Sequence, residues 1–536
     1  MTKSIRRLLA LALSLVLLCA ALPAFAASKK PEPTAEELGY TPASQLLEAD
    51  GKTIVFKDSV IAAAMEAEWG HLKNEDGSYP IKSLGKVDWL TLDGDPKGTG
   101  KDFPDMDLSE LQFFTKLPYL DISSVNKVTS VKAVSKVKRL YGFLLWKVED
   151  INLADLVEAT PKVSWAGLYF CGKMDLSPLA GYQKKLYGIT LAGENITDIG
   201  FLADMAKLQD VTLYNLAEDV DLSLLLEKTK LTSLSVNGKT ATRPEVAQII
   251  ENNPKISSLD IDADEWIVTA SLEDETEEQA EVAAAEESTG RENYISIPVE
   301  SIAKLTRLNR LSLSGVEIKD LEFLSGAKRL SSLYLYDCIV EDASVLAKLP
   351  KLKELTMIRA QVEKLTTEAG FKALSRLDLY GCGEELLSIL PQLPKLKELS
   401  LNDLSLKNVS FAEGFKTLAI LDVYNCNDVT LPDATALKKL KKLNVWESGL
   451  TDVSFAAGRT LDLLWLNDNS ITDIAPLAEA KAIKVLSVSG NEIKDYAPLA
   501  DIKKLTLVQC SEGADVPEMS KTEVLYGEDG WYDYLY

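Results

Sequence analysis

The sequence of 536 residues contains one histidine, His71, and six cysteines. A single histidine excludes metal sites built from several imidazole rings. A catalytic triad of a nucleophile, a histidine and an acid would have to use His71, and no nucleophile motif such as G-x-S-x-G accompanies it. We therefore expect His71 to be a surface residue and the protein not to be an enzyme.

Positive charge is also scarce, because the formal net charge is −23. This balance argues against nucleic acid or an anionic membrane surface as the main partner. It favours a soluble protein with basic or neutral partners. Long apolar runs are absent beyond the N-terminus, where no further stretch reaches the roughly 20 residues needed to span a bilayer.

The N-terminus has the pattern of a secretory signal peptide. A basic region precedes an apolar core at residues 8–22 and a small-x-small cleavage site at Ala24-Phe25-Ala26. We predict that residues 1–26 are removed and that no membrane insertion follows their removal. Cys19 offers a lipoprotein alternative, which is disfavoured because Leu18 stands where a small residue is expected.

From Leu308 to Leu507 the sequence repeats itself about every 22 residues. Triplets with apolar first and third residues begin at positions 311, 333, 355, 377, 399, 421, 443, 464 and 486. Looser copies begin at positions 90, 120, 143, 168, 189, 211, 234 and 259, and a last one begins at 505. A fixed period of this length predicts a solenoid, in which stacked units bury an apolar face that one unit cannot bury alone.

Five cysteines remain after the signal peptide. Cys338, Cys382, Cys426 and Cys510 each follow the second apolar residue of a triplet by three positions, which is the position of Asn469 in its own repeat. Coils stack about 4.8 Å apart, so cysteines two coils apart are about 10 Å apart, beyond the reach of a disulfide. We predict buried structural thiols. Cys171 falls on an outward position and is predicted to be the one reactive thiol.

Composition divides the rest of the chain. Residues 27–45 are rich in Lys, Pro, Glu and Thr, which predicts a flexible linker. A helix capped by Asp58 or Ser59, with one apolar face, predicts an N-terminal helical cap at residues 46–85. The solenoid is predicted at residues 86–514, and residues 515–536 are predicted to form a C-terminal cap or tail that covers the last coil.

An acidic insertion interrupts the solenoid at about residues 264–294. The stretch from Asp264 to Glu292 holds 11 acidic residues and few residues suited to a core. This composition predicts a disordered loop. An acidic docking arm for a basic partner is the alternative.

The clearest repeats match the pattern L-x-x-L-x-L-x-x-N/C-x-L of leucine-rich-repeat proteins. These are Leu461 to Leu477 and Val485 to Leu499, and the phrase Asn195-Ile-Thr-Asp-Ile199 is similar. With its 22-residue period and the phrase N-x-I-x-D-I-x-P-L, the chain resembles the internalin-type repeats of bacterial surface and secreted proteins over residues 54–510.

The resemblance implies an α/β solenoid. In this family the chain forms a curved leucine-rich-repeat right-handed superhelix, with a parallel β-sheet on the concave face and short helical or irregular convex segments. The concave sheet usually grips another macromolecule. We recognise no wall-anchor motif, immunoglobulin-like module or repeated wall-binding module, so the sequence does not support the cell attachment of surface-anchored members.

A glycine-rich stretch, Gly94 to Lys101, is not a phosphate-binding loop, because its spacing is wrong and Asp102 replaces the Ser or Thr. The preceding Asp93-x-Asp95 resembles the start of a calcium loop, but Lys97 and Pro104 occupy ligand positions. We interpret the stretch as a turn and predict no metal ion or cofactor. A loose calcium site formed by Asp93, Asp95, Asp105 and Asp107 is the alternative.

The outward side of the predicted sheet carries the candidate ligand site. In each triplet the two apolar residues point inward, so the residue between them and the residue after them point outward. These positions collect Trp146, Tyr169, Tyr214, Tyr334, Tyr336, Tyr380, Tyr424, Trp446, Trp465, Asp378 and Asp422. Tyr and Trp dominate binding hot spots. The alternative is ordinary packing, because aromatic residues also cover one another across a sheet.

We therefore predict a secreted leucine-rich-repeat binding protein, extracellular or associated with a bacterial cell surface. It is expected to be a monomer that recognises an extracellular protein ligand with its concave aromatic face. The alternative ligand is a polysaccharide, which would make the protein a carbohydrate-binding adhesin or a glycan-capture accessory. A structural spacer is a further alternative, in which the outward columns would tolerate alanine.

Overall fold

The computed structural model describes residues 33–263 and 294–527, apart from residues 367–369, 384–385, 388, 391–392, 394, 407–413, 428 and 432–436. The predicted signal peptide, nearly all of the predicted acidic insertion and the last nine residues lie outside the described part. No helix in the described ranges is both long enough and apolar enough to cross a membrane.

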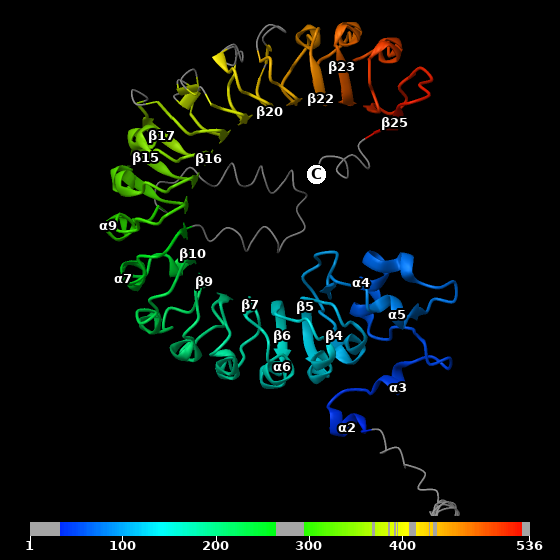
Figure 1. Ribbon diagram of the computed structural model, residues 1–536, viewed down its shortest axis with the longest axis vertical. Helices are drawn as coiled ribbons and strands as arrows, with labels where there is room; N and C mark the ends of the chain where they lie inside the picture. Colours follow the sequence, from blue (N-terminus) through cyan, green and yellow to red (C-terminus); the bar gives the residue numbers. More distant parts are fainter. Residues whose placement is uncertain are drawn as a thin grey trace, which may run out of the picture.

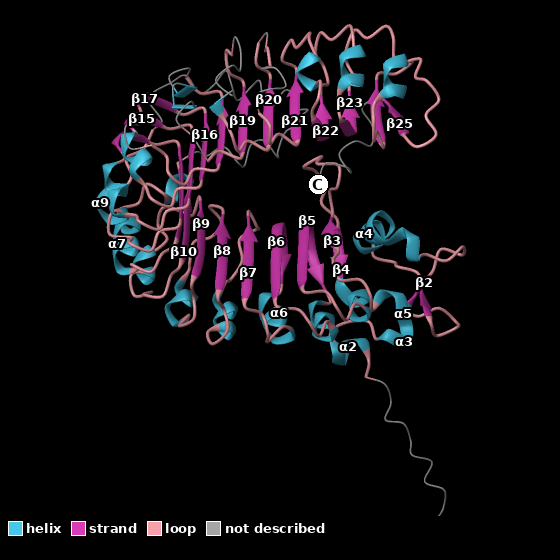
Figure 2. Cartoon of the chain, turned by 45° about the horizontal axis from the view of Figure 1, so that its top comes forward, coloured by secondary structure: helices cyan, strands magenta, loops and turns pink. Residues whose placement is uncertain are grey.

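The described chain forms an arc with strands along its inner side and helices along its outer side (Figures 1 and 2). Twenty strands build one parallel sheet, with one strand or more per coil. They are β3 (Thr91–Asp93), β4 (Asp105–Asp107), β5 (Tyr119–Thr129), β6 (Gly142–Ile151), β7 (Trp165–Tyr169), β8 (Gly188–Ala192), β9 (Asp210–Tyr214), β10 (Ser233–Asn237), β11 (Ser258–Asp262), β12 (Arg310–Ser314), β14 (Ser332–Tyr336), β16 (Glu354–Ile358), β18 (Arg376–Tyr380), β19 (Glu398–Asn402), β20 (Ile420–Tyr424), β21 (Lys442–Trp446), β22 (Thr460–Trp465), β23 (Ala482–Ser487), β24 (Leu507–Cys510) and β25 (Glu523–Tyr526).

The sheet is held in register by the apolar pair of each triplet. Leu335 lies opposite Met357, and the row continues through Leu379 and Leu401 to Val423. Each of these side chains is at most 1% exposed. The row is a continuous interior spine, which confirms the predicted curved α/β solenoid.

The outer side of the arc is made of short elements. The α-helices are α2 (Ala35–Leu38), α3 (Ala43–Leu46), α4 (Ser59–Trp69), α5 (Ile81–Leu84), α6 (Leu153–Ala159), α7 (Glu245–Asn252) and α9 (Val299–Ile302). Short 3-10 turns serve most other coils. Three coils add a second parallel sheet, with strands β13 (Glu317–Asp320), β15 (Ile339–Asp342) and β17 (Gln361–Lys364). A small antiparallel pair, β1 (Thr53–Ile54) and β2 (Tyr79–Pro80), lies near the N-terminus.

Both ends of the solenoid are covered. Helix α4 begins as predicted, because the Asp58 carboxylate accepts hydrogen bonds from the backbone N–H groups of Val60 and Ile61, both at 3.0 Å. At the other end, β25 pairs with β24, and the Gln509 Nε2 donates to the Gly527 carbonyl at 2.6 Å. Within the described residues no pairing joins β25 to β3, so the sheet is open.

The boundary of the predicted linker stays a prediction, but helix α2 lies within residues 27–45 and helix α3 begins there. Helix α2 carries a capping box at Thr34, and Tyr40, which follows it, is only 7% exposed. The Thr41 backbone N–H donates to the Ser109 Oγ at 2.9 Å. Tyr40 and Thr41 are therefore packed against the first coils, whereas α2 has no buried residue, and the flexible linker stays a prediction.

Two predicted strand registers are wrong. In β7 the inward residues are Ala166 and Leu168, which pair with Ile189 and Leu191, so the triplet begins two residues earlier than predicted. Small residues at 166 and 167 hid the strand signal. In β24 it is Val508 that pairs with Leu486, because the apolar residues Leu505, Leu507 and Val508 allow more than one register.

One buried carboxyl group links the cap to the turn that follows β4 in the first coil. Glu110 is 3% exposed, and its carboxylate accepts hydrogen bonds from the backbone N–H groups of Lys57 at 2.7 Å and Asp58 at 3.3 Å. Burial raises the pKa of Glu110 to about 7, and these backbone hydrogen bonds oppose the shift.

Because the pKa of Glu110 is raised, we expect the stability of the cap to depend on pH. The pKa of Glu110 is higher in the folded protein than in the unfolded chain, so protonated Glu110 stabilises the fold. This contribution to the free energy of unfolding is fully present below about pH 4.5 and is lost as the pH rises through 7. The loss is on the order of 3 kcal/mol. We expect the free energy of unfolding, measured by urea titration at pH 4.5 and 7.5, to fall over this range. Glu110→Gln should flatten that fall, and an equal fall in the variant would contradict the assignment.

Candidate ligand-binding face

The outward residues of the strands form columns along the concave side of the arc. The residue that follows each apolar pair makes one column, in which Tyr336, Ile358, Tyr380, Asn402, Tyr424 and Trp446 lie opposite one another in that order. The residue between the apolar pair makes a second column, in which Trp465 lies opposite Asn444. The register thus places the predicted residues as the repeat implies, while their role in binding stays a prediction.

The aromatic residues form two separate clusters instead of one stripe. In the N-terminal cluster the rings of Trp146 and Tyr169 stack with centroids 5.0 Å apart, and Phe170 contacts both Trp146 and Tyr214. Tyr214 is only 6% exposed. It therefore offers little contact area to a ligand, contrary to its selection as a site residue.

The C-terminal cluster occupies three neighbouring strands. The Tyr424 and Trp446 rings have centroids 4.8 Å apart, and the Trp446 and Trp465 rings are 5.7 Å apart and nearly parallel at 17°. The Trp446 Nε1 donates to the Asp468 carboxylate at 2.8 Å, which fixes the orientation of the ring. All three rings are half-buried, so each keeps surface toward the inside of the arc.

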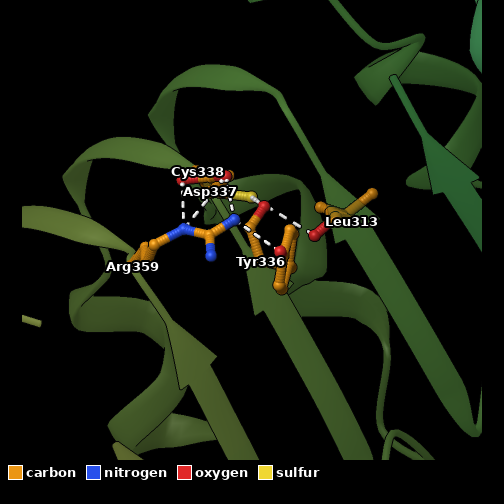
Figure 3. Close-up of polar contacts among 5 residues, drawn as sticks. All are labelled: Leu313, Tyr336, Asp337, Cys338 and Arg359. Carbon is orange, nitrogen blue, oxygen red and sulfur yellow. Dashed lines mark hydrogen bonds and ion pairs between the residues drawn. The ribbon is translucent and has the colours of Figure 1, made fainter. Parts of the chain in front are cut away.

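Between the clusters, arginine side chains cover the tyrosines. The Arg310 guanidinium lies 4.4 Å from the Tyr334 ring centroid, and that of Arg359 lies 4.6 Å from the Tyr336 ring centroid. Arg359 also pairs with the Asp337 carboxylate and donates to the Tyr336 hydroxyl (Figure 3). Tyr334 and Tyr336 are thus partly engaged within the chain, which interrupts the predicted aromatic stripe.

The two predicted acidic residues belong to a polar network on the same face. Asp378 accepts hydrogen bonds from Thr356 Oγ1 at 3.1 Å and from Arg376 Nε at 2.9 Å. Asp422 accepts one from Asn444 Nδ2. Burial raises the pKa of Asp422 to about 6, and the nearby charge of Asp378 adds to the shift. These carboxylates are thus held in place beside the C-terminal cluster.

Sequence reasoning missed exposed aromatic residues next to the starts of the strands. Tyr119, Tyr141 and Tyr187 are 43%, 43% and 47% exposed. The Tyr119 ring lies over Gly142 of the next coil, where an added Cβ would be 2.5 Å from the ring. Tyr119 is in the outward position before each apolar pair, so a projection that includes this position would have found it.

Two of the aspartates considered for a loose calcium site accept hydrogen bonds within turns of the chain. Asp95 accepts from Thr99 and Gly100, and Asp107 accepts from the Ser109 backbone N–H at 2.7 Å. Among the residues that the structure describes, no group of three or more His, Cys, Asp or Glu side chains is arranged to hold a metal ion.

A ladder of Asn and Cys side chains closes several of the coils after their strands. The Asn469 Nδ2 donates to three carbonyls, including Val445 of the preceding coil at 2.7 Å, and its Oδ1 accepts from the N–H groups of Ser448 and Leu450. The Cys338, Cys382 and Cys426 thiols each donate at 3.3 Å to the corresponding carbonyl of the preceding coil. This position, with the inward pair before it, is the structural signature of one repeat family. The chain has a leucine-rich-repeat fold.

Cys171 belongs to the same ladder, which corrects its predicted reactivity. Its thiol donates to the Leu145 carbonyl at 3.3 Å and is 5% exposed. Burial raises the pKa of the Cys171 thiol to about 11, which disfavours the reactive thiolate. The error follows from the register of β7. Cys510 lies in β24 itself and is buried there outside the ladder.

Comparisons with solved structures find several similar chains. The leucine-rich-repeat chain is similar to an internalin from Listeria monocytogenes, with 18% identity, a TM-score of 0.32 and coverage of 87% of this chain and 97% of that chain. It is also similar to a leucine-rich-repeat protein of Leptospira interrogans, with 16% identity, a TM-score of 0.35 and coverage of 77% and 93%. A plant peptide hormone receptor shares 15% identity over 83% of this chain and 75% of that chain, with a TM-score of 0.37. No protein-family model and no curated protein matches the chain. The strand register and the Asn and Cys ladder carry the fold assignment.

The ladder predicts a large loss of stability when one of its asparagines is removed. Asn469→Ala leaves two buried N–H groups and several carbonyls without their partner, so we expect the free energy of unfolding to fall by about 2–4 kcal/mol. Asn402→Ala is the matched control, because Asn402 makes a single 3.3 Å hydrogen bond on the open face. Its expected loss in the same urea titration is below about 1 kcal/mol. Equal losses would contradict the ladder's role.

Proposed function

We propose that this leucine-rich-repeat protein is exported and binds an extracellular protein ligand with the concave face of its solenoid. The single observation that supports this most is the C-terminal cluster of Tyr424, Trp446 and Trp465. Three large rings lie on neighbouring strands and keep exposed surface on the inner side of the arc. Such rings give large contact area for little lost side-chain entropy.

Order within the cluster supports a binding role over simple packing. The Trp446 ring is anchored at Nε1 by Asp468, and acidic residues surround the cluster, including Asp422 and Glu447. A rigid apolar centre with a polar rim is the usual anatomy of a protein-binding hot spot. Together with the net charge of −23, the rim favours a partner that is neutral or basic.

A polysaccharide is the second candidate ligand for the same face. The observation that favours it is the pair of nearly parallel indole rings of Trp446 and Trp465, because flat aromatic surfaces also stack on sugar rings. The polar side chains of Asn444 and Asp422 next to them can hydrogen-bond to hydroxyl groups. The two candidates differ in the ligand class that the face captures.

Alanine substitutions test the proposal directly. We expect Trp446→Ala and Trp465→Ala each to weaken binding of the captured protein ligand about 30-fold, since a hot-spot residue contributes about 2 kcal/mol or more. The ligand is first isolated from secreted proteins by capture on immobilised protein, and its affinity is then measured by titration calorimetry. A glycan array is probed in parallel with the same variants.

The matched control is Tyr187→Ala, which removes an exposed ring outside the cluster. Unchanged affinity in both tryptophan variants, with normal thermal unfolding, would exclude the C-terminal cluster as the binding site. Capture of a glycan that depends on both tryptophans, without capture of a protein, would establish the carbohydrate alternative. If no alanine variant on the concave face changed the binding of any ligand, the protein would be a structural spacer.

A further inference from the structure

The concave face is hollowed at its N-terminal end, over strands β3, β5 and β6. This N-terminal hollow has a volume of about 370 Å³. Its lining includes Asp93, Asp121 and Trp146 from the three strands and Asp95 from the loop at residues 94–101. The hollow is far along the solenoid from the C-terminal cluster, and the glycine-rich loop that borders it has no role in the function proposed above.

Hydrogen bonds fix the conformation of the loop that forms one side of the hollow. The Gly94 backbone N–H donates to the Ser123 carbonyl at 2.9 Å, which ties the loop to β5. Glycine is required at this position, because an added Cβ would lie 2.1 Å from the Ser124 carbonyl oxygen. The Asp95 carboxylate then accepts from the Thr99 N–H at 2.9 Å and the Gly100 N–H at 2.6 Å. These bonds hold the loop at the side of the hollow.

Negative charge in the hollow exceeds the positive charge that the chain supplies. Three aspartates line it, against the single cation Lys147. The Glu68 carboxylate, which accepts a hydrogen bond from the Thr91 N–H at 3.2 Å, adds a fourth negative charge nearby. Burial raises the pKa of Asp121, and the charges of Asp93 and Glu68 raise it further. In the described part of the chain, no hydrogen bond or ion pair engages the Asp121 carboxylate.

Aromatic surface stands beside this charge. Trp146 lines the hollow, and its ring also contacts the rings of Tyr169, at 5.0 Å, and Phe170, at 5.5 Å. Tyr119 precedes Asp121 by two residues on β5, so its 43% exposed side chain lies on the same face of the sheet. An aromatic ring next to an unneutralised carboxylate forms a site that suits a cation. The ring attracts the cation through its quadrupole, and the carboxylate accepts a charge-assisted hydrogen bond from it.

We propose that the N-terminal hollow binds the cationic side chain of an arginine or lysine of the protein ligand. This inference rests on the proposed function and adds the chemistry of one contact. The cation supplies the positive charge that Asp93 and Asp121 lack and packs against the indole ring of Trp146. The hydroxyl groups of a neutral sugar donate hydrogen bonds to carboxylates but bring no positive charge to balance the negative charge of Asp93 and Asp121.

The test uses small probes, so it needs no knowledge of the ligand. The full chain is labelled with 5-fluorotryptophan, and the ¹⁹F resonance of Trp146 is assigned with Trp146→Phe. N-acetyl-arginine amide is titrated at physiological salt, with N-acetyl-citrulline amide as an uncharged probe of nearly the same shape. We expect saturable shifts of the Trp146 resonance with the arginine probe, and much smaller shifts with the citrulline probe. A lysine amide probe is expected to behave as the arginine probe does.

Variants locate the charge that matters. Asp121→Asn should weaken binding of the arginine probe about tenfold, as expected for one lost charge-assisted contact. Asp260→Asn is the matched control, because Asp260 holds the same outward column on β11 and is half-buried there. We expect no change in this control, and thermal unfolding reports the folding of both variants.

Equal responses to the two probes, or an Asp121→Asn variant that binds like the unchanged protein, would overturn the proposal. Equal weakening by Asp260→Asn would also overturn it, because the effect would then be one of overall charge. The outcome is separable from that of the proposed function. Loss of ligand capture in the Trp446 and Trp465 variants concerns the C-terminal cluster and is measured with a different ligand.

Discussion

Each strand of the arc buries two apolar side chains against the equivalent two side chains of the neighbouring coils, and this stacking positions the rest of the molecule. One coil is too short to bury its own apolar face, so the coils are stable only together. The row from Leu335 to Val423 is the visible result, with every member at most 1% exposed. The Asn and Cys ladder supports the same stacking, because each rung donates to a carbonyl of the preceding coil.

The stacking also determines which side chains form the proposed binding surface. Residues one repeat apart in the sequence become neighbours across strands, and ring contacts such as that between Trp446 and Trp465 follow from the register. The surface is divided along the arc. Stacked rings occupy the C-terminal strands, arginine-covered tyrosines the middle, and a carboxylate-lined hollow the N-terminal strands. One extended ligand that contacts both ends would therefore meet an apolar site and a cation site on the same inner wall.

The fold was predictable because its determinants are local and periodic. The apolar pairs of the repeats from Leu311 onward showed where the strands lie. Asp58 was recognisable as a helix cap because it precedes a segment with one apolar face. The prediction failed where the periodic signal was weak. Ala166 and Gly167 concealed the start of β7, and that error alone made Cys171 look exposed. The site was less predictable, because it depends on contacts between neighbouring coils. The Tyr119 ring has room because residue 142 of the next coil is a glycine, and the Tyr336 ring is covered by Arg359 of the next coil. The hollow depends on how the loop after β3 folds, which has no repeat to reveal it.

A cross-linking measurement tests the in-register stacking most directly. Arg376 and Glu398 are 22 residues apart and lie opposite each other in β18 and β19. Strand spacing puts their Cα atoms about 4.8 Å apart, within the range of a disulfide. The account predicts that Arg376→Cys combined with Glu398→Cys forms a disulfide on mild oxidation, resolved by mass spectrometry of the digested protein. It predicts no disulfide when Arg376→Cys is combined with Ile420→Cys, because Ile420 lies opposite Glu398 one strand further along, about 9.6 Å from Arg376 and beyond the reach of a disulfide. Equal cross-linking of the two pairs, or none in either, would contradict the account.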